Sequence, residues 1–210
     1  MLAGKTVLVG VTGGVAVHYL PELIGQLRWR YLANVQAMMT PAATRFVTPL
    51  ILKAASGNPV YADLWEAAER APVIHVQLAC LADLVLIAPA TADILAKLAH
   101  GLADDLVTLT VLATRAPVVL APAMHEEMWI KAVVQDNVAR LQERGYHFVG
   151  PERGISTTGE VAEGRMANIG VIIAKLIDLA GELAGNEGEK KELAKDAHVR
   201  LSVSKLWPGI

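Results

Sequence analysis

The sequence contains very little cysteine, because Cys80 is the only one among 210 residues. A single thiol excludes an intrachain disulfide and a metal site built from several cysteines. It is also typical of a protein from a reducing compartment, so we expect a cytoplasmic location. Cys80 itself is expected to lie on a helix as a small buried hydrophobic side chain.

The chain also lacks an excess of charge of one sign and a long uninterrupted apolar run. It has 19 Lys and Arg residues against 21 Asp and Glu residues, a formal net charge of -2. We therefore expect no basic surface for nucleic acid or for an anionic membrane. The apolar runs are interrupted too often to span a bilayer, and residues 5–11 read as a strand rather than as part of a signal peptide.

The hydrophobic residues, 53% of the chain, are arranged as short apolar runs that alternate with helical patterns. Strands are predicted at 5–11 and 34–39, in the runs before PATAD and PAMHEE, and at YHFVG; helices are predicted at 15–30, 43–55, 126–144 and 168–183. This alternation predicts an α/β fold, a single-domain Rossmann-like (flavodoxin-like) parallel sheet with helices on both faces. We expect this domain to cover residues 1–184, and residues 185–210 to form a charged tail that is a solvated helix or a linker.

Two of the predicted strands end in small polar loops, within LVLIAPATAD and PVVLAPAMHEE. Loops at the carboxyl ends of parallel strands are where ligands bind, so these two loops and the preceding His75 suggest one shared site. The aromatic stretch 56–72, with Tyr61 and Trp65, is expected to run over the surface and to contact another subunit. Residues 151–166, rich in Gly and short polar residues, are a candidate flap over the site.

The turn Thr12-Gly13-Gly14 follows the first predicted strand and precedes a helical pattern. Such a turn can bind phosphate, although a plain structural turn explains it equally well. It does not match GxGxxG, and no acidic residue suited to a ribose follows the second strand, so NAD is not expected. Thr40 could bind phosphate or could begin the next helix.

Six motifs occur in a fixed order: GVTGGVA, MTPAATRFVTP, VIHVQLA, PATADILAKLAHGLADDL, PAMHEEMW and GEVAEGRM. Together they resemble the flavin-containing cysteine decarboxylases, over nearly all of residues 5–177. This family includes phosphopantothenoylcysteine decarboxylase and the peptidyl-cysteine decarboxylases that act on ribosomally made precursor peptides. The joint occurrence of the motifs is far more specific than any one of them.

The resemblance implies FMN as the cofactor and no metal. The residues that it places on FMN are Gly13, Gly14, Val15, Thr40, Thr91, Ala92, Asp93, Ile94 and Ala123. It implies that His75 is the catalytic histidine and that the substrate contacts Met124, His125, Met128, Trp129 and Thr158. Without the resemblance, His75 would be read as a structural histidine, Asp93 as a helix cap and Met128 as core filler.

Two positions depart from the family pattern. His125 replaces an Asn that is thought to hold the substrate carboxylate, and an imidazole can still donate a hydrogen bond there. Thr158 stands where phosphopantothenoylcysteine decarboxylases carry a Cys that protonates the enethiolate. A hydroxyl is a much poorer proton donor than a thiol, so the reaction is expected to stop at the enethiol.

This departure leads to the predicted function. It is FMN-dependent oxidative decarboxylation of the C-terminal cysteine of a precursor peptide to an aminoenethiol, for aminovinyl-cysteine formation. The alternative is phosphopantothenoylcysteine decarboxylase of coenzyme A biosynthesis. A hypothesis of another class is a flavin-binding regulatory subunit. The resemblance also implies a homotrimer or a dodecamer, with FMN bound between subunits.

Overall fold

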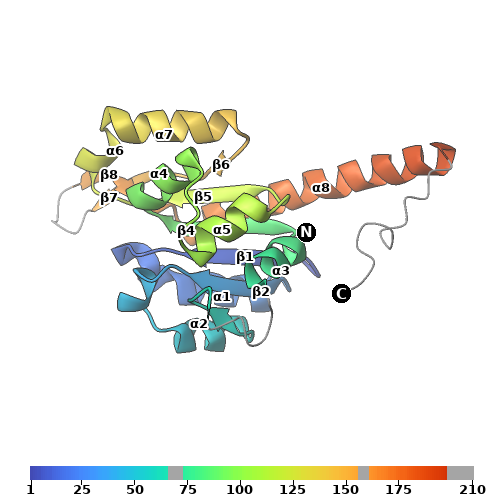
Figure 1. Ribbon diagram of the computed structural model, residues 1–210, viewed down its shortest axis with the longest axis horizontal. Coiled ribbons are helices and arrows are strands. Elements are labelled where there is room, and N and C mark those ends of the chain that lie inside the picture. Colours follow the sequence, from blue (N-terminus) through green and yellow to red (C-terminus); the bar gives the residue numbers. More distant parts are fainter. Residues whose placement is uncertain (66–72, 156–160, 198–210) are drawn as a thin grey trace.

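The computed structural model describes residues 1–65, 73–155 and 161–197. Its centre is a six-stranded sheet with the order β3-β2-β1-β4-β5-β6, and all neighbouring strands are parallel. The strands are β1 (Thr6–Val11), β2 (Asn34–Met39), β3 (Val60–Tyr61), β4 (Leu84–Ala90), β5 (Val118–Pro122) and β6 (His147–Phe148). Figure 1 shows this sheet between two layers of helices, which confirms the predicted fold class.

Side chains of the central strands alternate between two hydrophobic cores. In β1, Val7 and Val9 face one core and Leu8 faces the other, because successive residues of a strand point to opposite faces. The first core is covered by α1 (Leu20–Trp29), α2 (Pro49–Ser56) and α8 (Ile169–Ala197). The second is covered by α3 (Ile74–Leu81), α4 (Ala92–His100), α5 (Leu106–Ala113) and α7 (Ala132–Glu143).

The predicted helices are interrupted in the structure. Residues 15–30 form a 3-10 helix, Val15–Tyr19, followed by α1. In place of one helix at 43–55, a short 3-10 turn at Ala43–Arg45 precedes α2, which starts at Pro49. Thr48 is extended because the residue before a proline avoids the helical region. The predicted helix 126–144 is divided into α6 (Glu126–Trp129) and α7 by the extended backbone of Lys131.

Two predicted irregular segments contain strands. Stretch 56–72 includes β3, which pairs with Ala37 and Met38 of β2 at the sheet edge; Trp65 is exposed, as expected, and residues 66–72 lie outside the described ranges. The candidate flap forms an antiparallel hairpin of β7 (Glu152–Ile155) and β8 (Val161–Arg165). Residues 156–160 between them, Thr158 included, are also outside the described ranges.

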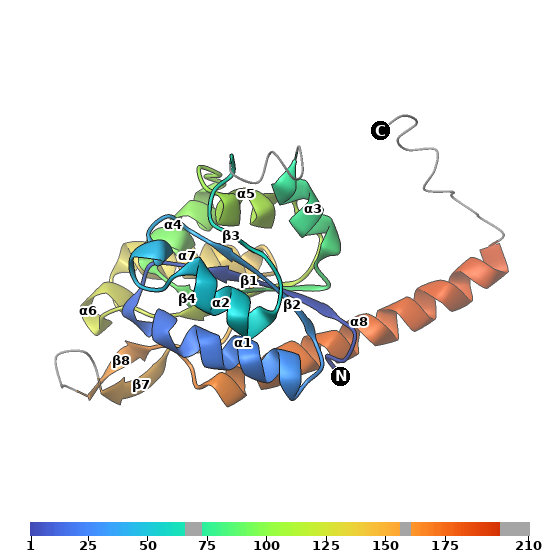
Figure 2. The same cartoon turned by 90° about the horizontal axis from the view of Figure 1, so that it is seen from below.

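Helix α8 runs without a break through the predicted boundary at residue 185, and it extends well beyond the body of the molecule (Figures 1 and 2). The two-part division of the chain therefore stays a proposal. None of the helices in the described ranges is long and apolar enough to cross a membrane.

The prediction that Cys80 is buried is wrong, because its side chain is exposed. Ile74 and Leu78, four residues apart on α3, face the core, and Cys80 lies on another face of the same helix.

Candidate active site

A cavity of about 990 Å³ lies where β1, β2, β4 and β5 end. Nearly all the residues predicted to bind cofactor or substrate line it: Gly13, Gly14, Val15, Thr40, Thr91, Ala92, Asp93, Ile94, Ala123, Met124, His125 and Met128. The volume is in the range of cavities that bind cofactors and other small molecules. The two strand-end loops that the sequence singled out therefore belong to one site.

The turn after β1 is packed tightly against the turn after β2. A Cβ on Gly13 would lie 2.6 Å from the Cβ of Ala42, so only glycine fits there. The hydroxyl of Thr12 donates a hydrogen bond to the carbonyl of Pro89 on β4, which connects this turn to the centre of the sheet. The result is a cradle of small residues with accessible backbone, a form suited to an anion such as phosphate.

Thr40 lies at the start of the 3-10 turn and also lines the cavity, so its position is compatible with both of the roles considered for it. Its hydroxyl oxygen lies 3.3 Å from the backbone N of Ala43, which donates to it at the start of the 3-10 turn. The O–H proton of Thr40 is not used by that bond. Thr40 also lines the cavity, so the hydroxyl can donate to a ligand.

Helix α4 begins at the first strand-end loop, and Thr91 rather than Asp93 is its N-cap. The Thr91 hydroxyl accepts a hydrogen bond from the backbone N of Ile94 at 3.3 Å. Asp93 lies in the first turn with a largely exposed carboxylate, 3.6 Å from the Nζ of Lys97. The N-terminus of α4 therefore faces the cavity with its positive dipole end.

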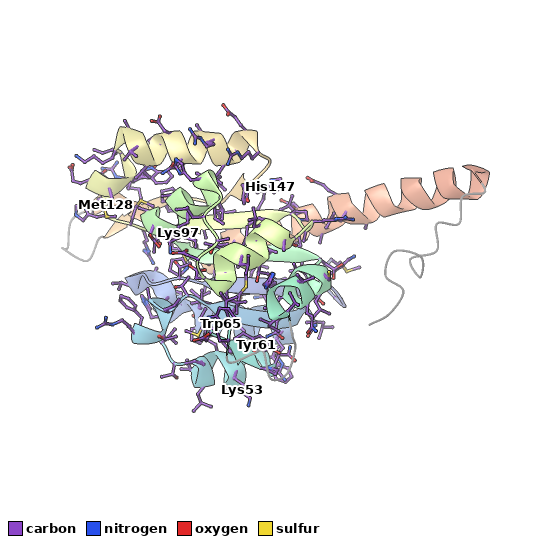
Figure 3. All side chains as sticks on the ribbon, in the orientation of Figure 1. Lys53, Tyr61, Trp65, Lys97, Met128 and His147 are labelled. Atoms are coloured by element: carbon purple, nitrogen blue, oxygen red, sulfur yellow. The ribbon has the colours of Figure 1, made fainter. Side chains whose placement is uncertain are left out.

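Lys97 is a cavity residue that was not among the predicted ones. Its Nζ lies 3.0 Å from Asp104 and 3.4 Å from Asp105, in addition to Asp93. Burial lowers the pKa of Lys97, but the hydrogen bond with Asp104 and the charges of Asp93 and Asp105 outweigh burial, so the pKa is raised. Figure 3 shows Lys97 at the same end of the molecule as Met128. The Asp93–Lys97 spacing of four residues was the signal available in the sequence.

His125 is the N-cap of α6 in the second strand-end loop. Its Nδ1 accepts a hydrogen bond from the backbone N of Glu127 at 3.2 Å. Because Nδ1 is the acceptor, the ring proton of the neutral imidazole is at Nε2. His125 can therefore donate a hydrogen bond from Nε2 to a ligand in the cavity.

The two remaining residues of this loop have different environments. Met128 is 47% exposed and lines the cavity, so it is not core filler. Trp129 is partly buried against the core between the sheet and α3, α4, α5 and α7. It does not line the cavity, so the structure gives it a packing role within one chain.

The hairpin β7–β8 forms one wall of the cavity. The backbone N of Met124 donates to the carbonyl of Gly164 at 2.9 Å, and the backbone N of Glu163 donates to the Glu126 carboxylate at 3.2 Å. Residues of the candidate flap line the cavity, although the sequence analysis gave none of them an individual role: Gly154, Ala162, Glu163, Gly164, Arg165 and Met166. The GEVAEGRM motif contains most of them and was the available signal.

His75 is not brought to this cavity within one chain. It lies near the start of α3, half-buried, and is not among the residues that line the cavity. Within one chain, the two loops meet in one site and His75 lies outside it.

Comparisons with known proteins identify the family to which this chain belongs. The family described as Flavoprotein matches residues 1–181. The crystal structure of the FMN-dependent cysteine decarboxylase SpaF is 36% identical, with a TM-score of 0.75, and the match covers 86% of this chain and 99% of SpaF. The chain belongs to the flavin-containing cysteine decarboxylases of the flavoprotein family. The predicted cofactor, FMN, is confirmed at the level of the family.

Two further proteins are similar to this chain over most of its length. The bifunctional coenzyme A biosynthesis protein CoaBC of Vibrio vulnificus is 46% identical over 165 residues, which are 79% of this chain and 41% of CoaBC. This chain thus spans less than half the length of the curated relative. A cysteine-to-serine mutant of PPC decarboxylase, complexed with pantothenoylaminoethenethiol, is 28% identical with a TM-score of 0.76, over 82% of this chain and 96% of that one.

Proposed function

We propose that this chain is an FMN-dependent decarboxylase of a cysteine at the carboxyl end of its substrate. The observation that carries the proposal is the cavity in which the PATAD and PAMHEEMW loops meet the Gly13-Gly14 turn. The PATAD loop and the Gly13-Gly14 turn suit the phosphate and the ring of a flavin. The PAMHEEMW loop presents a hydrogen-bond donor, the Nε2–H of His125.

Residues that follow the ends of four strands, β1, β2, β4 and β5, would hold FMN. The cradle at Gly13 and Gly14, together with the Thr40 hydroxyl, fits the phosphate. The start of α4 from Thr91 to Ile94 and the small Ala123 on the opposite side leave room for the flat ring. When bound, the flavin supplies hydride acceptance from the Cα–Cβ–S part of cysteine, which makes loss of CO2 easy.

The substrate carboxylate would bind His125. The hydrogen bond from the Glu127 backbone to Nδ1 orients the ring and keeps the neutral Nε2–H as a donor. Donation from a positioned group holds the carboxylate while the C–C bond to it weakens. An Asn at this position could also cap the helix and donate, which explains how the two residue types can share the role.

We propose that His75 acts in the cavity of a second copy of the chain, as the base that takes the thiol proton. Support comes from its position away from the cavity of its own chain and from the surface around it. Large apolar side chains are exposed on and near α3 and α5: Val73, Val76, Leu81 and Leu112. An exposed apolar patch of this kind marks a protein interface, in agreement with the homotrimer or dodecamer that the resemblance implies.

The relatives favour phosphopantothenoylcysteine as the substrate, which was the alternative. CoaBC is a coenzyme A biosynthesis protein at 46% identity, and the cysteine-to-serine PPC decarboxylase holds pantothenoylaminoethenethiol. That complex also holds an enethiol in an enzyme in which a cysteine is replaced by a residue with a hydroxyl group. This agrees with the expectation that Thr158 leaves an enethiol product.

A peptide with a C-terminal cysteine is the second candidate substrate. Thr158 in place of a proton-donating Cys and the likeness to SpaF over 99% of its length favour it. Both candidates end in a cysteine whose nitrogen is acylated and whose carboxylate is free, and a cytoplasmic location suits either one.

Mass spectrometry of the products separates these possibilities. Purified FMN-loaded protein is incubated in air with phosphopantothenoylcysteine and, separately, with a Cys-terminated peptide. Loss of about 46 Da corresponds to CO2 plus two hydrogens and supports the enethiol product, whereas loss of about 44 Da corresponds to CO2 alone. The substrate that loses mass identifies the function. Unchanged masses of both, with FMN bound, would instead favour a regulatory flavin-binding subunit.

A further inference from the structure

The active-site cavity adjoins a second, smaller cavity of about 330 Å³. Tyr19, Arg165 and Met166 line both of them, so these three residues form the junction. The second cavity continues between α1 and the segment that leads into α8, with Glu22, Gln26 and Asn168 in its wall. Figure 2 shows the β7–β8 hairpin beside the starting end of α1, where the junction lies.

Two neighbours hold the Arg165 side chain at this junction. Its Nη2 donates a hydrogen bond to the Tyr19 hydroxyl at 3.3 Å, and its guanidinium carbon lies 5.9 Å from the centre of the Tyr19 ring. The stem of the side chain lies over the backbone of Gly154, where any Cβ would be 2.8 Å from the Arg165 Cδ. Gly154 therefore provides the space for Arg165, and Tyr19 sets its direction.

Arg165 differs from the other cation of the active-site cavity in its partners. Lys97 has three carboxylates within 4 Å, so its charge is more than balanced. Among the residues that the structure describes, no carboxylate oxygen lies within 4 Å of the Arg165 guanidinium. A guanidinium at a cavity junction, with donors left over after one bond to a phenol, is suited to an anionic ligand.

We propose that Arg165 binds a phosphate monoester at the end of the substrate remote from the cysteine. The inference rests on the proposed decarboxylase function and deepens it, because it selects the phosphorylated substrate over the peptide. The cysteine carboxylate is assigned to His125, so a second anionic end needs a second cation, and arginine binds phosphate through two parallel hydrogen bonds. The Glu22 carboxylate repels an anion deeper in the second cavity, which places the phosphate at the junction.

Equilibrium binding to the FMN-loaded protein tests this without any turnover. Phosphopantothenate and pantothenate differ only in the phosphate and are titrated by calorimetry. The wild-type protein should bind the phosphorylated compound about ten- to a hundredfold more tightly, since hydrogen bonds between charged groups contribute that much. Arg165→Gln should bind both compounds equally, with the affinity for pantothenate unchanged.

Three further variants show whether the preference for the phosphorylated compound depends on the charge of Arg165, on the geometry of its side chain and on its location. Arg153→Gln removes an exposed arginine of β7 that lines neither cavity, and should keep the wild-type preference. Gly154→Ala keeps the Arg165 charge but displaces its stem, and should lose part of the preference. Arg165→Lys keeps the charge without the planar fork and should also lose part of it.

Two results would overturn the inference. The first is equal binding of both compounds by the wild-type protein. The second is loss of bound FMN from Arg165→Gln, because the anion at Arg165 would then be the phosphate of the cofactor. These outcomes are distinct from failure of the proposed function: a protein that prefers phosphopantothenate but decarboxylates nothing supports the site and contradicts the reaction.

Discussion

The backbone N of Met124 donates a hydrogen bond to the carbonyl oxygen of Gly164 at 2.9 Å. This bond joins the PAMHEEMW loop after β5 to the GEVAEGRM hairpin, two motifs about 40 residues apart in the sequence. Gly164 has φ +134°, and a Cβ on it would lie 2.2 Å from the Met124 carbonyl oxygen. The cavity wall therefore depends on the absence of a side chain at residue 164.

Gly164→Ala should destabilise the protein by at least about 2 kcal/mol, because strained backbone alone costs on the order of 1–3 kcal/mol and the clash adds to it. Denaturation by urea measures the change. Gly25→Ala is the matched control: Gly25 is inside α1 with no atom within 4 Å of its missing Cβ. That change should stabilise by about 0.5–1 kcal/mol, since alanine is the better helix former. Equal effects of both substitutions would contradict this account of Gly164.

Asp105 combines two roles that can be separated by substitution. Its side chain accepts from the backbone N of Thr108 at 2.9 Å in a capping box, and it pairs with Lys97. Asp105→Ala should cost about 1–2 kcal/mol of unfolding free energy through the lost cap. Asp105→Asn should cost much less, because asparagine caps as well as aspartate and Lys97 keeps Asp93 and Asp104. If the two variants are equally unstable, the charge rather than the cap is responsible.

The lowered pKa of His147, a residue of β6, leads us to expect that the stability of the protein depends on pH. Burial and the nearby Lys175 lower the pKa of His147, and Glu182 only partly opposes them. The unfolded chain then binds a proton on this residue more readily, at its ordinary value of about 6.5. The contribution of His147 to the free energy of unfolding is therefore fully present above pH 6.5. It is lost as the pH drops from 6.5 toward the lower pKa of His147 in the folded protein.

Lys175→Met should raise the pKa of His147 in a nuclear magnetic resonance titration, and His147→Gln should lose this part of the acid destabilisation. Lys53→Met is the control, because Lys53 lies on the far side of the molecule from His147 (Figure 3). A His147 pKa that does not move in Lys175→Met would contradict the assignment of the cause.

The sequence could predict most of the cavity, for physical reasons that are clear at particular residues. Gly13, Thr91 and His125 follow apolar strand runs, and parallel strand ends meet at one edge of the sheet. Lys97 was missed although its spacing from Asp93 was visible in the sequence, whereas Arg165 was missed because its place depends on a contact between distant elements, its hydrogen bond to Tyr19. Periodicity does not encode such contacts.

Elements at the sheet edge were harder to predict than those at its centre. β1, β4 and β5 are continuous buried runs, whereas β3 has two half-buried residues and no apolar pattern of its own. The division between α6 and α7 falls at Lys131, where no proline or glycine marks a break. His75 was predicted from the family motif, and one chain by itself does not bring it to the cavity; its role as the base in the cavity of a second copy stays a proposal.

Co-expression of two inactive variants tests whether His75 acts between copies. His75→Asn removes the proposed base and His125→Ala removes the proposed carboxylate donor. In mixed oligomers, a copy with intact His125 can receive an intact His75 from its neighbour, so about a quarter of the wild-type activity should return with equal random mixing. No recovery in verified mixed oligomers would mean that both residues act within one chain.

Release of labelled CO2 from a substrate with an isotope-labelled cysteine carboxyl group tests the central claim most directly. The FMN-loaded wild-type protein and His75→Asn, matched for FMN content by absorbance, are each given labelled phosphopantothenoylcysteine and a labelled Cys-terminated peptide. The account predicts that the wild-type protein releases labelled CO2 from one of them and that His75→Asn releases almost none while keeping its FMN. Release of no labelled CO2 from either substrate by the wild-type protein would contradict it.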